Sequence, residues 1–130
     1  MHVLVIGSGG REHALCWGVA RSSLATRLSC CPGNGGIANL AECVDISVED
    51  FDDIVAHCHR ETVDFVIVGP EVPLVGGLVD RLEQEGILAF GPNRRAAILE
   101  GSKVFTKTLC LKHNIPTAAY GVFQDIDEAR

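Results

Sequence analysis

A short apolar run that ends in a glycine-rich turn constrains this chain more than any other feature. The run is His2-Val3-Leu4-Val5-Ile6, and Gly7-Ser8-Gly9-Gly10 follows it directly. Two valines and an isoleucine bounded by glycine are typical of a strand buried in a parallel sheet. Apolar residues then recur at helical spacing from Ala14, which predicts a helix that begins near Arg11. Strand, turn and helix aim backbone N–H groups and a helix N-terminus at one point, which attracts phosphate.

The turn matches only part of the dinucleotide-binding pattern G-x-G-x-x-G. Gly7 and Gly9 occupy the first two glycine positions and would permit a tight turn and a close approach of ligand, but the third position is Glu12. The pattern also needs an acid about 20 residues further on, to hold ribose hydroxyls, and none lies between Glu12 and Glu42. No P-loop pattern occurs either. A smaller phosphorylated ligand is therefore favoured over a nicotinamide or flavin cofactor, with the Arg11 guanidinium facing its oxygens.

Composition limits the classes of partner. The chain has 130 residues and a formal net charge of −6, which argues against nucleic acid or an anionic membrane as partner. We expect no signal peptide and no membrane span, and hence a cytoplasmic protein. The six cysteines form no C-x-x-C pair, so we expect reduced and mostly buried thiols. His57 and His59 flank Cys58 at a spacing that does not share a helix face, so we expect solvated histidines and no metal site.

Strand-like and helix-like segments alternate through the first part of the chain. Further strands are expected at 27–31, 43–46, 64–68 and 87–90, and further helices are expected over 51–58 and 75–82. The alternation predicts an α/β, Rossmann-like parallel sheet with helices on both faces and the strand order 3-2-1-4-5. Loops 7–12 and 69–74 would then meet where the order reverses, with loop 32–36 beside them. We expect a shared ligand site there.

The character of the sequence changes after Pro92. We expect a short helix over 94–99, a second helix capped by Ser102, a strand over 120–123 and the start of a helix at 125–129. The boundaries predicted for the two domains are 1–101 for the first and 102–130 for the second, which would be truncated.

Several motifs resemble one enzyme family. The stretch VLVIGSGGREHA at 3–14 is similar to the opening of the phosphoribosylamine–glycine ligases, also called glycinamide ribonucleotide synthetases. PGNGG at 32–36 resembles that family's P-G-N-x-G loop, and VGPEVPL at 68–74 resembles its V-G-P-E-x-P-L. Shorter matches follow at 90–92, 99–103, 105–107 and 115–118, so the resemblance covers essentially the whole chain. The departures are Gly35 and Val72, where the family often has alanine.

The resemblance implies a ligase of purine biosynthesis in the ATP-grasp superfamily. That family joins glycine to 5-phosphoribosylamine while ATP is converted to ADP and phosphate, through an acyl phosphate of glycine. It implies a Rossmann-like pre-ATP-grasp domain followed here by the truncated start of an ATP-grasp domain. The magnesium or manganese ligands are expected beyond residue 130. No catalytic or metal-binding residue is therefore expected in this chain, which would bind the sugar phosphate and be inactive alone.

The resemblance also implies roles for single residues. The backbone of Gly9 and Gly10, together with Arg11, would hold the 5-phosphate. Glu12 would either accept from the ribose hydroxyls or cap the turn at the helix start, and both roles stay open. The remaining substrate-binding residues would be Asn34, Gly69, Pro70 and Glu71. Lys103 and Lys107 would either contact the phosphates of ATP or remain solvated helix lysines.

Two other classes of function compete with this interpretation. One is a nicotinamide-dependent oxidoreductase domain, which the missing third glycine and the missing acid disfavour. The other is a non-catalytic nucleotide-sensing or scaffold module, which the fold alone would permit. A reading frame that continued past residue 130 into a glycine-rich ATP-binding segment and acidic metal ligands would favour the ligase.

Overall fold

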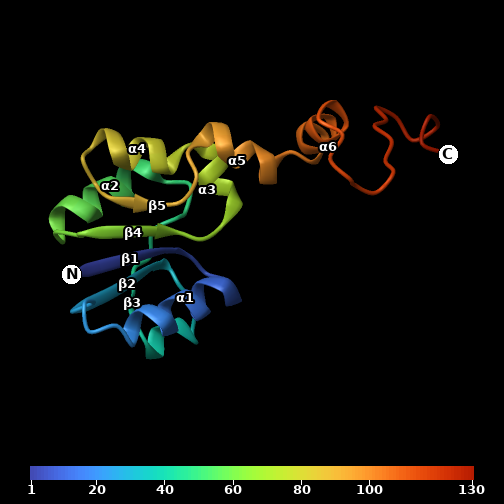
Figure 1. Ribbon diagram of the computed structural model, residues 1–130. Helices are drawn as coiled ribbons and strands as arrows, with labels where there is room; N and C mark the ends of the chain where they lie inside the picture. Colours follow the sequence, from blue (N-terminus) through green and yellow to red (C-terminus); the bar gives the residue numbers. More distant parts are fainter. The chain divides into compact units, whose positions relative to one another are not determined.

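A computed structural model describes all residues 1–130, and contacts within it divide the chain into two units, Met1–Ala97 and Ile98–Arg130. The first unit contains one parallel sheet of five strands in the order β3-β2-β1-β4-β5 (Figure 1). The strands are β1 (His2–Gly7), β2 (Arg27–Pro32), β3 (Glu42–Cys43), β4 (Phe65–Val68) and β5 (Ala89–Phe90). This is the predicted strand order, and the Rossmann-like α/β fold class is confirmed.

Helices cover both faces of the sheet. Helix α1 (Gly10–Ala20) and the short 3-10 helix η1 (Ile37–Asn39) lie on one face, and α2 (Phe51–Arg60), α3 (Glu71–Gly76) and α4 (Leu78–Gln84) lie on the other (Figure 1). The single helix expected over 75–82 is interrupted, because Gly77 adopts a left-handed conformation with φ of 96° that ends α3. Helix α5 (Arg94–Gly101) follows β5.

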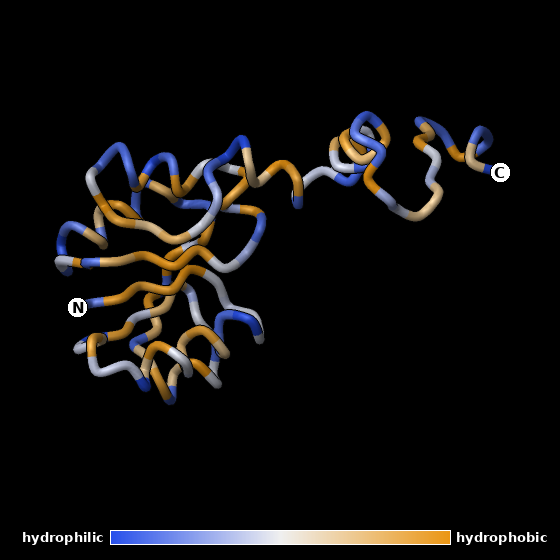
Figure 2. Tube along the Cα trace, viewed as in Figure 1, coloured by the Kyte–Doolittle hydropathy of each residue, from blue (hydrophilic) through white to orange (hydrophobic).

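The core lies on both sides of β1, all six residues of which are buried. Leu4 and Ile6 point toward the α2 face, whereas Val5 packs with Cys16 and Cys30 beneath α1. The strands accordingly form the apolar centre of the unit (Figure 2). Each fully buried aliphatic side chain of this kind contributes roughly 1.5–3 kcal/mol of transfer free energy, so β1 anchors the elements that surround it.

The six cysteines are free thiols. Cys16, Cys30, Cys31 and Cys58 are buried, as expected. Cys30 and its neighbour Cys31 belong to different core clusters, because successive side chains of a strand point to opposite faces.

One expectation fails in the unit Ile98–Arg130. Helix α6 (Lys103–Lys112) forms and is capped by Ser102, whose Oγ accepts from the Phe105 amide at 3.2 Å. The strand expected over 120–123 is absent, whereas the helix start expected at 125–129 is present as a bend and one turn that does not continue into a helix. Residues 120–123 make no backbone hydrogen bond to another segment, and a strand without a neighbour has no ladder to stabilise it.

The prediction of two solvated histidines on α2 is wrong for His57 and correct for His59. His57 is only 4% exposed, whereas the side chain of His59 is 55% exposed. The Nδ1 atom of His57 accepts from the Arg60 guanidinium at 3.2 Å, and its Nε2 atom is buried without a partner. Burial, and secondarily the Arg60 charge, lower the pKa of His57, which favours the neutral form of this ring in the folded protein.

None of the helices combines the length and the apolar character that crossing a lipid bilayer requires.

Candidate functional site

Three loops meet at the carboxyl ends of β1, β2 and β4, where the strand order reverses. The Arg11 Nη1 atom donates to the Gly69 carbonyl at 2.5 Å, which joins the start of α1 to the β4–α3 loop. The Asn34 Nδ2 atom donates to the Ser8 carbonyl at 2.7 Å, which adds the loop after β2. The structure thus brings together the three loops that the sequence places at one crevice, and ligands of open α/β sheets bind at this position.

An open hollow of about 270 Å³ lies between the β1–α1 turn with the start of α1 on one side and the β4–α3 loop on the other. Pockets for drug-sized ligands measure roughly 300–1,000 Å³, so this hollow suits a smaller molecule. Six of the eight residues predicted to bind substrate line it: Gly9, Gly10, Arg11, Glu12, Pro70 and Glu71. The other two, Gly69 and Asn34, hold the loops that form its walls.

The amino-terminal end of α1 opens toward this hollow. The amides of Gly10 and Arg11 donate to no other group of the protein, and free amides at a helix start carry the partial positive charge that anions seek. The Gly9 amide, in contrast, donates to the Glu12 Oε2 atom at 2.7 Å. Of the predicted phosphate contacts, those of Gly10 and Arg11 are therefore open, while the Gly9 amide already has a partner.

Glu12 is almost completely buried, with 4% of its surface exposed. Its carboxylate turns back into the β1–α1 loop and accepts from Gly9, which is three residues earlier. Of the two roles that the sequence leaves open for Glu12, this geometry shows the capping of the turn.

Asn34 and Glu71 differ in how much of their polar surface is available. The Asn34 Oδ1 atom accepts from the amides of Gly36 and Ile37 at 2.8 and 3.0 Å, while its amide group donates to Ser8. Asn34 is therefore occupied in holding loops. Glu71, the first residue of α3, is exposed at the wall of the hollow and makes no hydrogen bond from its side chain to the protein.

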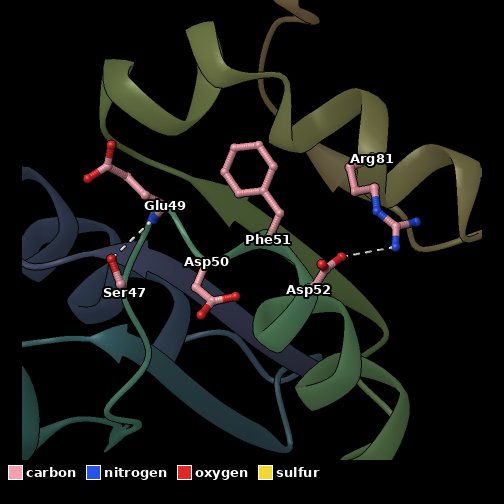
Figure 3. Close-up of a pocket in the computed structure, with 6 residues that line it drawn as sticks. All are labelled: Ser47, Glu49, Asp50, Phe51, Asp52 and Arg81. Atoms are coloured by element: carbon pink, nitrogen blue, oxygen red, sulfur yellow. Dashed lines mark hydrogen bonds and ion pairs between the residues drawn. The ribbon is translucent and has the colours of Figure 1, made fainter.

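A larger hollow of about 560 Å³ lies elsewhere, at the start of α2 (Figure 3). Three carboxylates line it, from Glu49, Asp50 and Asp52, and its single cation, Arg81, is paired with Asp52 at 3.3 Å. Asp50 also caps α2 by accepting from the Asp53 amide. The excess of negative charge repels a phosphate, so the smaller hollow beside Arg11 is the better site for an anionic ligand.

In the unit Ile98–Arg130, the two predicted ATP contacts border a hollow of about 200 Å³. The Lys107 ammonium donates to Thr117 Oγ1 at 2.6 Å and to the Ala118 carbonyl at 2.9 Å, and it lies 5.5 Å from the centre of the Tyr120 ring. Lys103 makes no such contact. No group of three or more His, Cys, Asp or Glu side chains is placed to hold a metal ion.

Fold and site together define an open, doubly wound parallel α/β domain in which a helix start with free amides lies at the switch point. Comparison with known proteins gives the particular family. Residues 1–100 match the family model described as phosphoribosylglycinamide synthetase, N domain. The chain belongs to this family, which confirms the resemblance read from its motifs.

Individual relatives agree with the family model. The chain is 55% identical over 130 residues to a phosphoribosylamine–glycine ligase of Brucella melitensis biotype 1, and 53% identical to one of Mesorhizobium japonicum. These matches include the whole chain but only 30% and 31% of the two relatives. The chain therefore spans about a third of the length of the curated relatives that it matches.

Solved structures show the same architecture. The crystal structure of the phosphoribosylamine–glycine ligase of Thermotoga maritima aligns with a TM-score of 0.65 and 28% identity, over 92% of this chain and 26% of the other. The N5-carboxyaminoimidazole ribonucleotide synthetase of the same organism aligns with a TM-score of 0.67 over 98% of this chain and 35% of the other, but at 18% identity. The second likeness shows the fold alone.

Proposed function

We propose that this chain is the sugar-phosphate-binding, amino-terminal part of a cytoplasmic phosphoribosylamine–glycine ligase. The whole enzyme would join glycine to 5-phosphoribosylamine and convert ATP to ADP and phosphate, as a step of purine biosynthesis. Residues 1–101 would form the substrate-binding domain, and residues 102–130 would begin the ATP-grasp domain. The ligase name of relatives about half identical over the whole chain supports this proposal.

The single observation that carries the substrate assignment is the pairing of Arg11 with the open start of α1 at one hollow. A terminal phosphate placed there would accept from the free amides of Gly10 and Arg11 and would lie beside the Arg11 guanidinium. Hydrogen bonds to charged groups contribute about 1.5–3 kcal/mol each, and a guanidinium matches two phosphate oxygens at once. The size of the hollow favours a pentose monophosphate over a dinucleotide.

The sugar and its amine would extend from the phosphate toward the β4–α3 loop. Pro70 and Glu71 line that side of the hollow, and the exposed carboxylate of Glu71 is available to accept from an amine or a hydroxyl group. Gly69 and Asn34 would contribute by holding the loops in place.

ATP and its magnesium or manganese ion would be bound chiefly by the part of the ligase for which this chain has no counterpart. Lys103 and Lys107 would reach the nucleotide phosphates, and Lys107 would first have to leave its partners Thr117 and Ala118. The metal ion would supply charge neutralisation for phosphoryl transfer. We therefore expect the 130-residue chain to bind the sugar phosphate without making product.

Substitution of Arg11 tests the proposal. We expect Arg11→Ala to weaken the binding of ribose 5-phosphate by roughly 10- to 100-fold, since one charge-assisted contact is lost. Titration calorimetry gives the dissociation constant, and circular dichroism shows whether the fold is intact. Arg11→Lys keeps the charge but loses the fork, so its affinity should fall between those of the wild type and Arg11→Ala.

The matched control is Arg21→Ala. Arg21 follows the same helix and stacks over the Trp17 ring at 4.5 Å, away from the hollow, so its loss should leave ribose 5-phosphate binding unchanged. Equal affinity in Arg11→Ala and wild type would remove Arg11 from the site. A larger rise in melting temperature with NAD than with ribose 5-phosphate would contradict the substrate assignment.

A further inference from the structure

Three glycines from two loops surround the buried side chain of Glu12. A Cβ atom added to Gly7 would lie 2.6 Å from Glu12 Cγ, and one added to Gly9 would lie 2.8 Å from Glu12 Oε2. A Cβ atom added to Gly69 would collide with Glu12 Oε1 and would lie 2.8 Å from both Cγ and Cδ. Real Cβ atoms almost never approach so closely, so a side chain at any of these positions would require Glu12 to move: its carboxylate oxygen at Gly9, and also its Cγ and Cδ atoms at Gly7 and Gly69.

Backbone conformation explains only one of the three glycines. Gly7 has φ of 126°, which disfavours any other residue. Gly9 is extended, with φ of −88° and ψ of −177°, and Gly69 is not in the left-handed region. Backbone strain therefore does not account for glycine at Gly9 and Gly69, where the atoms closest to an added Cβ belong to Glu12.

Glu12 also occupies the atoms that a dinucleotide site uses. In the pattern G-x-G-x-x-G the second glycine lets the backbone approach the pyrophosphate, and the third lets helix and strand pack closely. Here the amide of the second glycine, Gly9, donates to Glu12 instead, and the side chain of Glu12 replaces the third glycine. The carboxylate thus takes the hydrogen-bond donor and the volume that a second phosphate group would need.

Arg11 and Glu12 hold the facing loop at the same residue. Arg11 donates to the Gly69 carbonyl while Glu12 contacts the Gly69 α-carbon region. The two neighbouring side chains thus add to the pairing of β1 with β4 and to the hydrogen bond from the Gly69 amide to the Ile6 carbonyl at 3.2 Å, which already hold the two loops side by side.

We propose that Glu12, wedged between Gly7, Gly9 and Gly69, is the specificity-determining residue that restricts this site to a single phosphate group. The inference rests on the proposed function, since it presumes a phosphate at the start of α1. Glu12 acts through the loop geometry and the Gly9 amide, and it is a positioning residue that need not touch the substrate.

A pair of probes tests the specificity: ribose 5-phosphate, with one phosphate, and inorganic pyrophosphate, with two. In Glu12→Gly the Gly9 amide and the space beside it become free. We expect the preference for ribose 5-phosphate over pyrophosphate, taken as the ratio of dissociation constants, to fall by at least about 10-fold. Glu12→Gln keeps the volume and an acceptor for Gly9 without the charge, so its ratio should stay within about 3-fold of the wild type.

Two results would overturn the proposal. A ratio that changes as much in Glu12→Gln as in Glu12→Gly would show that charge alone excludes the second phosphate. An unchanged ratio in Glu12→Gly would show that Glu12 does not set the preference.

The wedge itself is tested by melting temperature, without any ligand. Gly69→Ala should lower the melting temperature by about 4 °C or more, because its methyl group overlaps Glu12. In the Glu12→Gly background the same change should cost less than half as much, since the space is vacant. Gly18→Ala is the matched control, because a Cβ at that α1 position meets nothing within 4 Å and should not lower the melting temperature.

The two experiments separate this inference from the proposed function. If the wild type bound neither probe, the proposed function would fail, and the melting data would still decide whether Glu12 is the wedge. If Gly69→Ala cost the same with and without Glu12, the wedge would be refuted even in a protein that binds ribose 5-phosphate.

Discussion

Each of the two units of this chain contains a helix capped by a polar side chain, but only the helix of the first unit is packed into a core. In Met1–Ala97 the side chain of Asp50 caps α2, and in Ile98–Arg130 the side chain of Ser102 caps α6. Each accepts a hydrogen bond from the backbone amide three residues further along the chain, at 3.1 and 3.2 Å respectively. Helix α2 buries Ile54, Val55 and Cys58, whereas no residue of Ile98–Arg130 is buried. Caps and helix formers are therefore enough to specify a helix, but not to give it a core.

The difference comes from the sheet. In the first unit, parallel strands place apolar side chains on two faces, and each face receives a helix layer. In the second unit, large apolar side chains lie exposed, among them Leu111 at 71% and Ile126 at 70%. Because little apolar surface is removed from water, the helix in this unit is stabilised mainly by its own hydrogen bonds and its cap. These interactions alone make a helix of about ten residues only marginally stable.

The sharpest test of this contrast compares two leucines. Leu4→Ala removes a fully buried side chain from β1 and should lower the free energy of unfolding by about 2–5 kcal/mol. Leu111→Ala, at an exposed position of α6, should change it by no more than about 0.5 kcal/mol. Urea unfolding followed by the fluorescence of Trp17, the single tryptophan, reports the first unit directly. Equal losses in the two variants would mean that the units do not differ in burial.

The two caps provide a smaller, matched comparison. Asp50→Ala should destabilise the first unit by about 1 kcal/mol, because the Asp53 amide loses its acceptor in a helix that is part of the core. Ser102→Ala removes the same kind of bond from α6, and it should leave the urea midpoint of the first unit unchanged. Instead, hydrogen exchange of the α6 amides should accelerate. A shift of the Trp17 transition by Ser102→Ala would contradict the separation of the units.

The smallest expected effect concerns the pH dependence of stability. Burial and the Arg60 and His2 charges lower the pKa of His57 from its usual 6.5, and the Glu61 and Glu42 carboxylates oppose this only in part. Below pH 6.5 the unfolded chain therefore binds more protons at this residue than the folded protein does. Stability from this source is present above pH 6.5 and is lost as the pH falls toward the lower, folded pKa.

Replacement of this histidine should remove that contribution. The fall in melting temperature between pH 7.5 and pH 5.5 should be smaller in His57→Gln than in the wild type. The control is His113→Gln, which replaces an exposed histidine after α6. This variant should show the same fall in melting temperature as the wild type. An identical pH dependence in all three proteins would show that His57 titrates alike in the folded and unfolded chains.

Much of the fold and of the loop arrangement could be predicted from local patterns. The apolar run before Gly7 predicts β1, and the alternation of segments predicts the strand order that the structure confirms. The same order places the loops that contain Arg11, Asn34 and Gly69 at one crevice, and the hydrogen bonds between them are present. These features depend on periodicity and chain connectivity, both of which a sequence displays.

The sequence by itself determined the fold class, the family and the position of the crevice, because local preferences and motif spacing encode them. Tertiary structure alone decided that Gly69 lies against the Glu12 side chain and that His57 is buried. It also decided that residues 120–123 form no strand. Each of these outcomes depends on which distant segment lies within a few ångströms, and no local pattern contains that distance.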